Sequence, residues 1–496
     1  MAVTFVALSA VYVVFLRWTQ IDAPDHRLPE LPPVRVDGPV TRSGSSFLAR
    51  RGRVWVLGLE GQPIRIGLDH GRLLSPLMAQ GDEVMQALYA RYVPSRLARG
   101  LIDTLVRAKN RNLAESFPEA RRAEIFGESR GYRDRFADWM PTFQRLVYLH
   151  GLYDISLAFE QSPLLACTSF FATGEATRDG HTWVGRNFDF DVDPWFDREK
   201  VVQLVRVAGS VPYVSVAWPG MTGVVTGMNA EGVWVAVHGA RGGEREGEGT
   251  PVVFTTRAIL EQARTLDEAV AIAIRDRPMV PHMLVIADGD DGRAAVVERA
   301  PGVETAVVWG DGATLGISNH YRSPGLRGDP RNRAVRDTTS TVARGTRMDE
   351  LLRVHRGRID ATVGVAMLRD RRASETTDRP LGHRAAIDGL LAAHGVVADL
   401  TARVLWVSES PHLLGRFVRF DVGALRTSEG LARSATAPDE GAIAADPMTS
   451  DGRYARFLLG ARWRREAESL RAVGDLDGAV EMIERALALR DDDHEA

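Results

Sequence analysis

The chain has 496 residues, of which 45% are hydrophobic and 26% are charged, and its formal net charge is −3. This length accommodates two or three domains with sizeable cores, and the nearly balanced charge gives no reason to expect a nucleic-acid partner. The one cysteine, Cys167, excludes an intrachain disulfide, and a single thiol is a poor basis for a metal site. We therefore expect neither a metal nor a cofactor.

The N-terminal segment is apolar. Residues 2–16 carry no charge, although the run is shorter than the ~20 residues that cross a bilayer comfortably. A cleaved signal peptide is disfavoured, because no Lys or Arg precedes the run and no small-residue cleavage site follows it. We expect residues 1–18 to be an uncleaved membrane anchor, with a buried strand or helix start as the alternative. The expected location is a bacterial inner membrane with the globular body of the chain outside the cytoplasm, although Arg17 and Arg27 argue weakly against export.

The segments between this run and Cys167 differ in composition. Residues 19–46 carry five prolines, which is typical of an extended linker. The runs 54–57 and 64–67 are rich in strand-forming residues. Residues 78–160 show apolar residues at helical spacing, which predicts a helical region.

From Cys167 to about residue 421, short strand-like runs alternate with glycine-rich turns. The runs are residues 201–207, 211–217, 232–238, 283–287, 294–298 and 305–309. One amphipathic helix is predicted over residues 256–275. Dense strands with segregated helices indicate an α+β fold, in which helices cover sheets.

The C-terminal part begins with a second predicted linker over residues 426–450. Two helices are predicted over residues 451–490, with the spacing of one tetratricopeptide unit. One such unit cannot bury its own apolar face, so we expect it to dock on the main body, on a second copy of the chain or on a protein partner. An ordinary helical hairpin packed on the body is the alternative.

The surroundings of Cys167 predict a reactive site. Asp179-Gly180 between two strand-like runs is a strong hairpin signal. Such a hairpin would bring Arg186 and Asp189 back beside Cys167. A positive charge next to a thiol favours the thiolate, which is the nucleophilic form. A cross-strand ion pair between Arg186 and Asp189 is the structural alternative.

The motif Cys-Thr-Ser-Phe from Cys167, followed by an Asp-Gly turn and Gly-Arg-Asn-Phe-Asp-Phe, resembles the mature start of cysteine-type N-terminal nucleophile (Ntn) hydrolases. It is most similar to the isopenicillin N acyltransferase-like family, which is related to the choloylglycine hydrolases. Further similarities follow in the same order, at residues 61–71, 219–223, 227–233, 318–321, 405–407 and 411–412. Together they cover about residues 47–425.

The resemblance implies a four-layer αββα sandwich made as a precursor. Residues 47–166 would form the propeptide lobe and residues 167–425 the catalytic domain, followed by a C-terminal domain over residues 451–496. The bond between Ala166 and Cys167 would be cut autocatalytically. The freed α-amine, with an ordinary pKa of about 7.7–8.0, would then be a general base beside its own thiol.

The resemblance also assigns roles to other residues. Asp189 would hold the new amine, Arg186 would favour the thiolate, and Asn319 would donate to the amine or to the oxyanion. The family usually has an Asn where this chain has His238 or Gly239, so either residue is a candidate oxyanion donor. A strand-end histidine without a catalytic role is the alternative for His238. A further arginine of the site is sought among four candidates, which are Arg331, Arg333, Arg384 and Arg416.

Aromatic residues near the motif are candidates for an acyl pocket. We expect Phe170, Phe171, Trp195 and Trp218 to bind substrate, although aromatic residues in strands more often belong to the core.

Two functions follow from these observations. The first is a self-processed amidohydrolase or acyltransferase that moves an acyl group from a small amide substrate through an S-acyl intermediate on Cys167. The second is a catalytically inactive, membrane-tethered scaffold of the same fold, which recruits a partner through its C-terminal helices.

Overall fold

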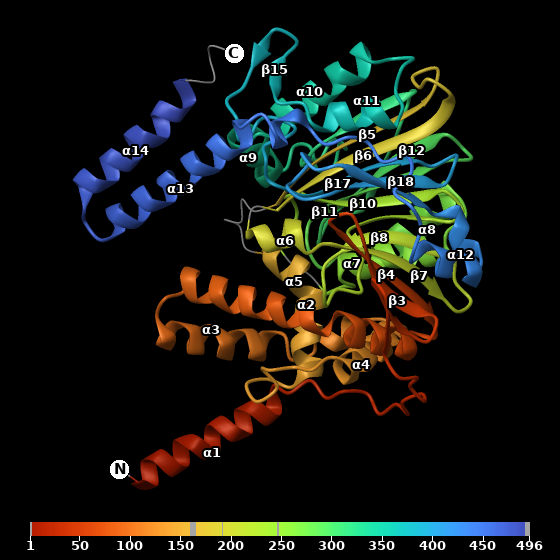
Figure 1. The fold of residues 1–496 in the computed structure, drawn as a ribbon. Coiled ribbons are helices and arrows are strands. Elements are labelled where there is room, and N and C mark those ends of the chain that lie inside the picture. The colour runs from red at the N-terminus through yellow and green to blue at the C-terminus, as the bar shows by residue number, and fades with distance from the viewer. Residues whose placement is uncertain (1, 159–164, 191, 246–247, 492–496) are drawn as a thin grey trace.

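The computed structural model describes residues 2–158, 165–190, 192–245 and 248–491. Within these residues the strands form an eleven-stranded sheet A, a six-stranded sheet B and a separate two-stranded hairpin (Figure 1). Residue 1 of the expected anchor and residues 492–496 of the expected C-terminal domain lie outside the described residues.

Sheet A has the strand order β1-β2-β3-β4-β7-β8-β9-β10-β11-β12-β13. Its strands are β1 (Arg35–Asp37), β2 (Val40–Ser43), β3 (Ser46–Arg51), β4 (Val54–Gly61), β7 (Val201–Val207), β8 (Tyr213–Ala217), β9 (Thr226–Asn229), β10 (Val233–Gly239), β11 (His282–Asp288), β12 (Arg293–Arg299) and β13 (Ala306–Trp309). Sheet B has the order β14-β5-β6-β17-β18-β19. Its strands are β5 (Leu165–Gly174), β6 (Gly180–Phe190), β14 (Thr314–Ile317), β17 (Ala392–Asp399), β18 (Val404–Ser408) and β19 (Phe417–Asp421), and the small hairpin joins β15 (Arg372–Ser374) to β16 (Thr377–Asp378).

The helices before Cys167 are α1 (Ala2–Trp18), α2 (Pro63–Tyr92), α3 (Arg96–Lys109), α4 (Glu119–Gly131) and α5 (Thr142–Ala158), with the short 3-10 helix η1 (Leu113–Ser116). The helices after Cys167 are α6 (Pro194–Arg198), α7 (Val252–Gln262), α8 (Leu266–Arg275), α9 (Pro330–Thr338), α10 (Thr341–Val354), α11 (Ala361–Leu368), α12 (Ser428–Ser434), α13 (Arg453–Ala472) and α14 (Leu476–Asp491), with η2 (Gly423–Arg426) and η3 (Pro447–Thr449).

The buried apolar side chains divide the molecule into layers. One core lies between the sheets and joins Phe171 of β5 to Trp234 of β10. A second core packs α2, α4, α5, α7 and α8 on the outer face of sheet A. A third packs α10 and α11 on the outer face of sheet B. The order is therefore helices, sheet B, sheet A, helices, as the α+β expectation requires (Figure 1).

The segments on either side of Cys167 belong to one folded body. Strand β4 pairs in parallel with β7, so that Trp55 lies opposite Val201 within sheet A. Buried ion pairs join the same segments, because the Arg257 guanidinium of α7 lies 2.7 Å from the Glu124 carboxylate of α4. The residues before Cys167 thus contribute strands and helices to the common core.

The structure revises four local expectations. The run 64–67 belongs to helix α2, whose first position is Pro63, a residue well suited to a helix start. The predicted helix 256–275 is two helices, because Thr265 caps α8 by accepting a hydrogen bond from the Glu268 amide. The expected linkers contain ordered elements: β1 and β2 lie within residues 19–46, and α12 and η3 lie within residues 426–450.

The expected membrane-spanning anchor over residues 1–18 is not supported. Although α1 is helical, no helix among the described residues has both the length and the apolar character needed to cross a membrane. The membrane placement that rested on this anchor is withdrawn with it.

The expected C-terminal helical pair is present as α13 and α14. The two helices pack on each other and extend away from the sheets (Figure 1). Gly460, Ala467, Ala479 and Ala486 are their buried small residues. A single pair gives no support for a tetratricopeptide array.

Candidate functional site

The hairpin of β5 and β6 builds the site around Cys167. The strands are antiparallel, with Cys167 opposite Phe188, Ser169 opposite Arg186, and Ala166 opposite Asp189. Alternate residues of a strand point to opposite faces, so Cys167, Ser169 and Arg186 share one face of sheet B. This is the hairpin that Asp179-Gly180 predicts.

Arg186 holds the thiol. Both side chains are fully buried, and Arg186 Nη2 lies 3.1 Å from Cys167 Sγ. The guanidinium also donates to the Val225 carbonyl at 2.5 Å and to the Val237 carbonyl, both in or beside sheet A. It lies 4.8 Å from the centre of the Phe188 ring. These contacts bridge the two sheets and fix the guanidinium beside the sulfur.

The backbone of Cys167 is held by two other side chains. Its amide donates to Asn319 Oδ1 at 2.8 Å, and its carbonyl accepts from Arg344 Nη1 at 2.6 Å. Arg344 Nη2 also donates to Asn319 Oδ1 at 2.9 Å. Asn319 is oriented in turn by the Thr341 hydroxyl, which accepts from its backbone amide at 2.7 Å. The thiol, the amide and the carbonyl of Cys167 are therefore each contacted by a side chain of the site.

Burial dominates the ionisation of this cluster. It raises the pKa of the Cys167 thiol, although Arg186 and Arg344 oppose the rise. The expected thiolate is therefore not favoured in the uncut chain, because desolvation outweighs the neighbouring positive charge. Burial also raises the pKa of Asp189 to about 7, against the effect of Arg344. Asp189 Oδ1 forms no hydrogen bond with another described residue.

His238 faces Ser169 rather than the sulfur. Its Nε2 lies 2.7 Å from Ser169 Oγ, and burial holds its pKa well below the usual value, so the imidazole is neutral. The neighbouring Gly239 offers its carbonyl to Asn319 Nδ2 at 2.9 Å. The choice of oxyanion donor between these two residues stays a prediction.

Arg344 was missed by the sequence reasoning. Of the four candidates, Arg331 and Arg333 of α9 donate to the carbonyls of Gly243 and Gly328. Arg416 pairs with Glu409, and the charge of Arg384 lowers the pKa of Asp189. One signal for it was present in the sequence. Arg344 has the helical spacing that places it on the same face of α10 as the buried residues Met348, Leu351 and Leu352. A charged residue within an apolar helical stripe indicates a specific buried partner.

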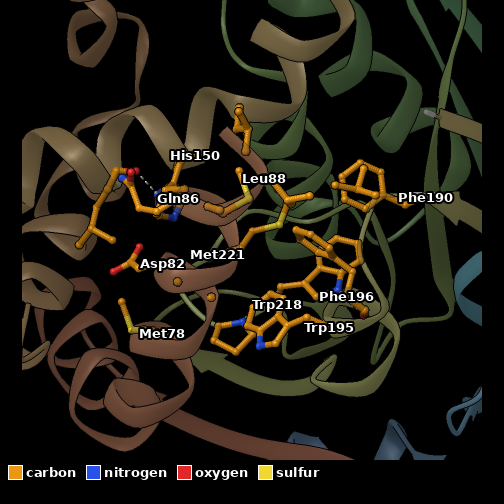
Figure 2. Close-up of a pocket in the computed structure, with 18 of the residues that line it drawn as sticks. Met78, Asp82, Gln86, Leu88, His150, Phe190, Trp195, Phe196, Trp218 and Met221 are labelled. Carbon is orange, nitrogen blue, oxygen red and sulfur yellow. Dashed lines mark hydrogen bonds between the residues drawn. The ribbon is translucent and has the colours of Figure 1, made fainter. Parts of the chain in front are cut away.

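An apolar cavity of ≈ 500 Å³ is lined by residues of α2, α5, β6 and α6, and Cys167 itself is not among them (Figure 2). Its wall includes Phe188, the cross-strand partner of Cys167, and extends along α2 to Tyr92. Trp195 and Trp218 both line it, as the sequence predicts. Figure 2 shows them with Phe196 on one side of the cavity, while Met78 and Asp82 lie on the other.

Phe170 and Phe171 lie elsewhere. Phe171 is buried between the sheets, whereas Phe170 points to the opposite face of sheet B and packs against α11. Neither is among the residues that line the cavity. The expectation that they bind substrate is not supported, because successive residues of β5 face two different cores.

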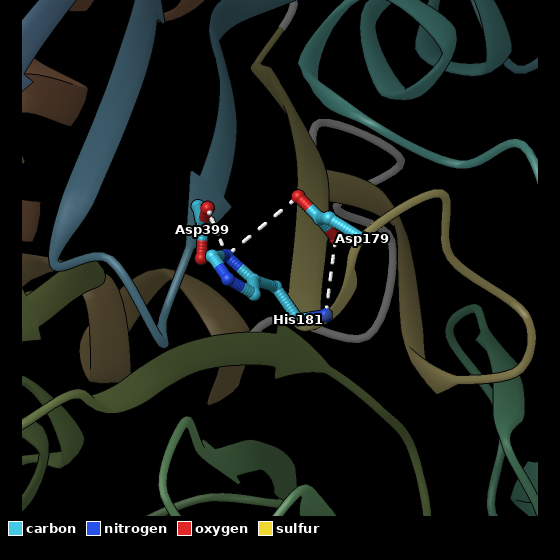
Figure 3. A group of neighbouring side chains, drawn as sticks. All are labelled: Asp179, His181 and Asp399. Atoms are coloured by element: carbon cyan, nitrogen blue, oxygen red, sulfur yellow. Dashed lines mark hydrogen bonds and ion pairs between the residues drawn. The ribbon is translucent and has the colours of Figure 1, made fainter.

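Among the described residues, one group of side chains has the spacing of metal ligands. It joins Asp179 and His181, at the turn between β5 and β6, to Asp399 of β17 (Figure 3). His181 Nδ1 lies 2.9 Å from Asp399 Oδ2, and this hydrogen bond raises the pKa of His181. The group lies at the turn end of the hairpin, whereas Cys167 lies at the opposite end of β5. It is therefore separate from the candidate site.

Comparisons with known proteins agree with the resemblance in the sequence. Residues 176–382 match the sequence model of the acyl-coenzyme A:6-aminopenicillanic acid acyltransferase family. An uncharacterised protein of Archaeoglobus fulgidus is 24% identical over 250 residues, an alignment that spans 47% of this chain and 41% of the relative.

Two solved structures are also similar. The Caenorhabditis elegans ortholog of N-acylethanolamine-hydrolysing acid amidase is 19% identical, with a TM-score of 0.35 over 47% of this chain and 93% of that chain. A C2A mutant of conjugated bile acid hydrolase from Clostridium perfringens is 12% identical, with a TM-score of 0.36 over 51% of this chain and 92% of that chain. The family match agrees with the resemblance in the sequence over residues 176–382, which begin after Cys167 and make up less than half of the chain.

Proposed function

Because residues 176–382 match the acyltransferase family, we propose that the chain is a self-processing cysteine amidohydrolase or acyltransferase with the αββα fold of Ntn hydrolases. The observation that carries the proposal is the set of side-chain contacts to Cys167. Arg186 contacts its sulfur, Asn319 its amide and Arg344 its carbonyl. Any buried residue needs partners for its amide and carbonyl, but a buried structural cysteine does not need a guanidinium held against its sulfur.

The first step is cleavage between Ala166 and Cys167. The sulfur adds to the Ala166 carbonyl carbon, the C–N bond breaks, and the thiol proton passes to the departing nitrogen. Water then hydrolyses the resulting thioester, which leaves a carboxylate on Ala166 and a free thiol and amine on Cys167. Asn319 Oδ1 already contacts this nitrogen at 2.8 Å. Asp189 lies opposite Ala166 and titrates near neutral pH, which suits it to carry the proton.

The second step uses the new amine as the base. The buried thiol has a raised pKa and needs a base to ionise near neutral pH. An α-amine is such a base and is covalently held beside the sulfur. Asp189 Oδ1 has no hydrogen-bond partner among the described residues and would accept from this amine. Arg186 would stabilise the thiolate, which attacks the acyl carbonyl and forms the S-acyl intermediate.

The cavity supports a substrate with an apolar acyl group. It begins at Phe188 beside the thiol, and its wall is built mainly from aromatic and aliphatic side chains. The amide bond of a bound small molecule would lie at Cys167, with the acyl group in the cavity. Water or an amine would then accept the acyl group.

An inactive scaffold of the same fold is the second candidate function. Helix α14 exposes an apolar row to solvent: Leu476 (63%), Val480 (57%), Ile483 (40%) and Leu487 (51%). Such a row suits the recruitment of a helical partner. This function needs no cleavage and predicts an intact chain.

Intact mass after purification separates the two functions. The enzyme predicts fragments 1–166 and 167–496 in the wild type and one uncut chain in Cys167→Ala. Thr173→Ala, farther along β5, is the matched control and should cut normally. An uncut wild type that also shows no alkylation-sensitive hydrolysis of N-acyl amides would refute the enzyme.

A further inference from the structure

Helix α3 shows its apolar face to solvent. Leu97, Leu101 and Leu105 are one helical turn apart and are 87%, 62% and 60% exposed. A surface helix of a globular protein ordinarily turns such a stripe towards the core. Here the stripe is exposed to solvent, and α3 itself lies beside α2, away from the sheets (Figure 1).

The polar residues of α3 face the body instead. Asp103 Oδ1 accepts from the Tyr89 hydroxyl at 3.1 Å, and Arg107, the buried residue of this helix, donates to the Trp139 carbonyl at 2.9 Å. Arg99 donates to the Val93 carbonyl at 2.7 Å. The orientation of α3 is therefore fixed by hydrogen bonds, and the outward stripe is a built feature of the fold.

The surroundings of the stripe are basic. Residues 91–111 contain six basic residues and one acidic residue. Arg91, in the last turn of α2, and Arg96, the first residue of α3, are both exposed. An outward apolar stripe with basic flanks is the pattern of helices that lie in the interface of an anionic bilayer.

The stripe also adjoins the cavity. Tyr89 and Tyr92 line the cavity at the end of α2, and the Tyr89 hydroxyl bonds to the backbone and side chain of α3. Tyr92 is itself 62% exposed. A surface docked on α3 would thus lie beside the end of the cavity that is formed by α2.

We propose that α3 docks on an anionic lipid surface, with Leu97, Leu101 and Leu105 inserted among the lipids and the basic flanks against their headgroups. This peripheral contact needs no spanning helix and does not depend on catalysis. If the proposed function also holds, it places the cavity where an apolar acyl amide leaves the bilayer.

Flotation with vesicles tests the contact. The protein is the full uncut chain carrying Cys167→Ala, and the probes are vesicles of phosphatidylcholine alone and with 30% phosphatidylglycerol. We expect binding to the anionic vesicles that weakens as salt rises, since exposed charges are screened. Combined Leu97→Ser, Leu101→Ser and Leu105→Ser should weaken this binding by at least about 100-fold, because each loses most of its apolar burial. Helix α1 stays intact throughout, so the loss reports on α3.

The matched control alters three exposed apolar residues on the C-terminal helices. Val473→Ser, Val480→Ser and Leu487→Ser should leave vesicle binding unchanged. The proposal is refuted if the α3 variant binds as the parent does, or if both variants lose binding equally. It is also refuted if the parent ignores vesicles and is a dimer that the α3 variant converts to a monomer, because the occupant would then be a second copy. None of these outcomes depends on whether Cys167 is catalytic.

Discussion

Replacing Arg344 gives a direct test of the site. Its recorded hydrogen bond to Cys167 is made to the backbone carbonyl and not to the sulfur, so the substitution leaves the contacts of the thiol in place. Its guanidinium donates to the Cys167 carbonyl at 2.6 Å, to Thr168 Oγ1 at 2.7 Å and to Asn319 Oδ1 at 2.9 Å. Arg344→Ala removes all three hydrogen bonds and leaves their acceptors buried. We expect the variant to slow both cleavage at Cys167 and turnover.

The magnitude follows from the contacts. Removing one preorganised donor at a reaction centre costs roughly 10²–10³ in rate, or about 2.7–4 kcal/mol of barrier. Leaving these buried acceptors without a donor also costs about 1–3 kcal/mol of stability each. Arg344 is moreover the main group that lowers the pKa of Asp189. In Arg344→Ala the pKa of Asp189 should therefore rise further, and the pH profile of cleavage should move upward.

Arg347→Ala is the matched control on the same helix. Arg347 is also buried, and it bonds to Asp370 at 2.7 Å and Glu350 at 2.7 Å, outside the site. Its loss should cost comparable stability, measured by urea unfolding, yet leave cleavage within about threefold of the wild type. The assay is intact mass against time after refolding. Equal slowing in both variants, or wild-type cleavage in folded Arg344→Ala, would refute the assignment.

Three further predictions concern groups around the site and the hairpin. In the uncut chain the pKa of Asp189 is raised to about 7 from an unfolded value of about 3.9, so its stabilising contribution is complete below pH ~3.9 and is lost as the pH rises through 7. Asp189→Asn in uncut Cys167→Ala should gain stability over its parent between pH 4 and pH 8 in urea titrations, and a constant difference would contradict the raised pKa. Met221→Trp narrows the cavity and should lower kcat/KM for long N-acyl amides at least tenfold while sparing N-acetyl ones; equal loss for both chain lengths would show that the cavity does not hold the acyl group. The hydrogen bond to Asp399 raises the pKa of His181 in the folded protein. The stabilisation that this pair gives is therefore fully present below pH ~6.5, and it is lost as the pH rises through the raised pKa of His181. Asp399→Asn should return the NMR-measured pKa of His181 towards 6.5, and an unchanged value would remove Asp399 as the cause.

The local features of the site could be predicted from the sequence because they depend on neighbouring residues. Asp179-Gly180 between two β-rich runs specifies a tight hairpin, and strand periodicity then places Arg186 on the same face as Cys167. The same reasoning predicted most strands of sheet A, because each of them is a short run of strand-forming residues bounded by turn residues. It could not exclude Phe170 and Phe171 as cavity residues, because strand periodicity does not show that the two faces of β5 are buried in two other cores.

The tertiary structure decided what depends on distant segments. Arg344 reaches the Cys167 carbonyl from a helix 177 positions along the chain, and no local pattern specifies that approach. The ionisation of the thiol was also decided there: the sequence places positive charge beside Cys167, but only the packed layers supply the burial that raises its pKa. The outward stripe of α3 likewise follows from the hydrogen bonds of its polar face to the body. Sequence alone determined which residues are adjacent on a strand, whereas the fold determined which of them water can reach, and desolvation by the fold sets their chemistry.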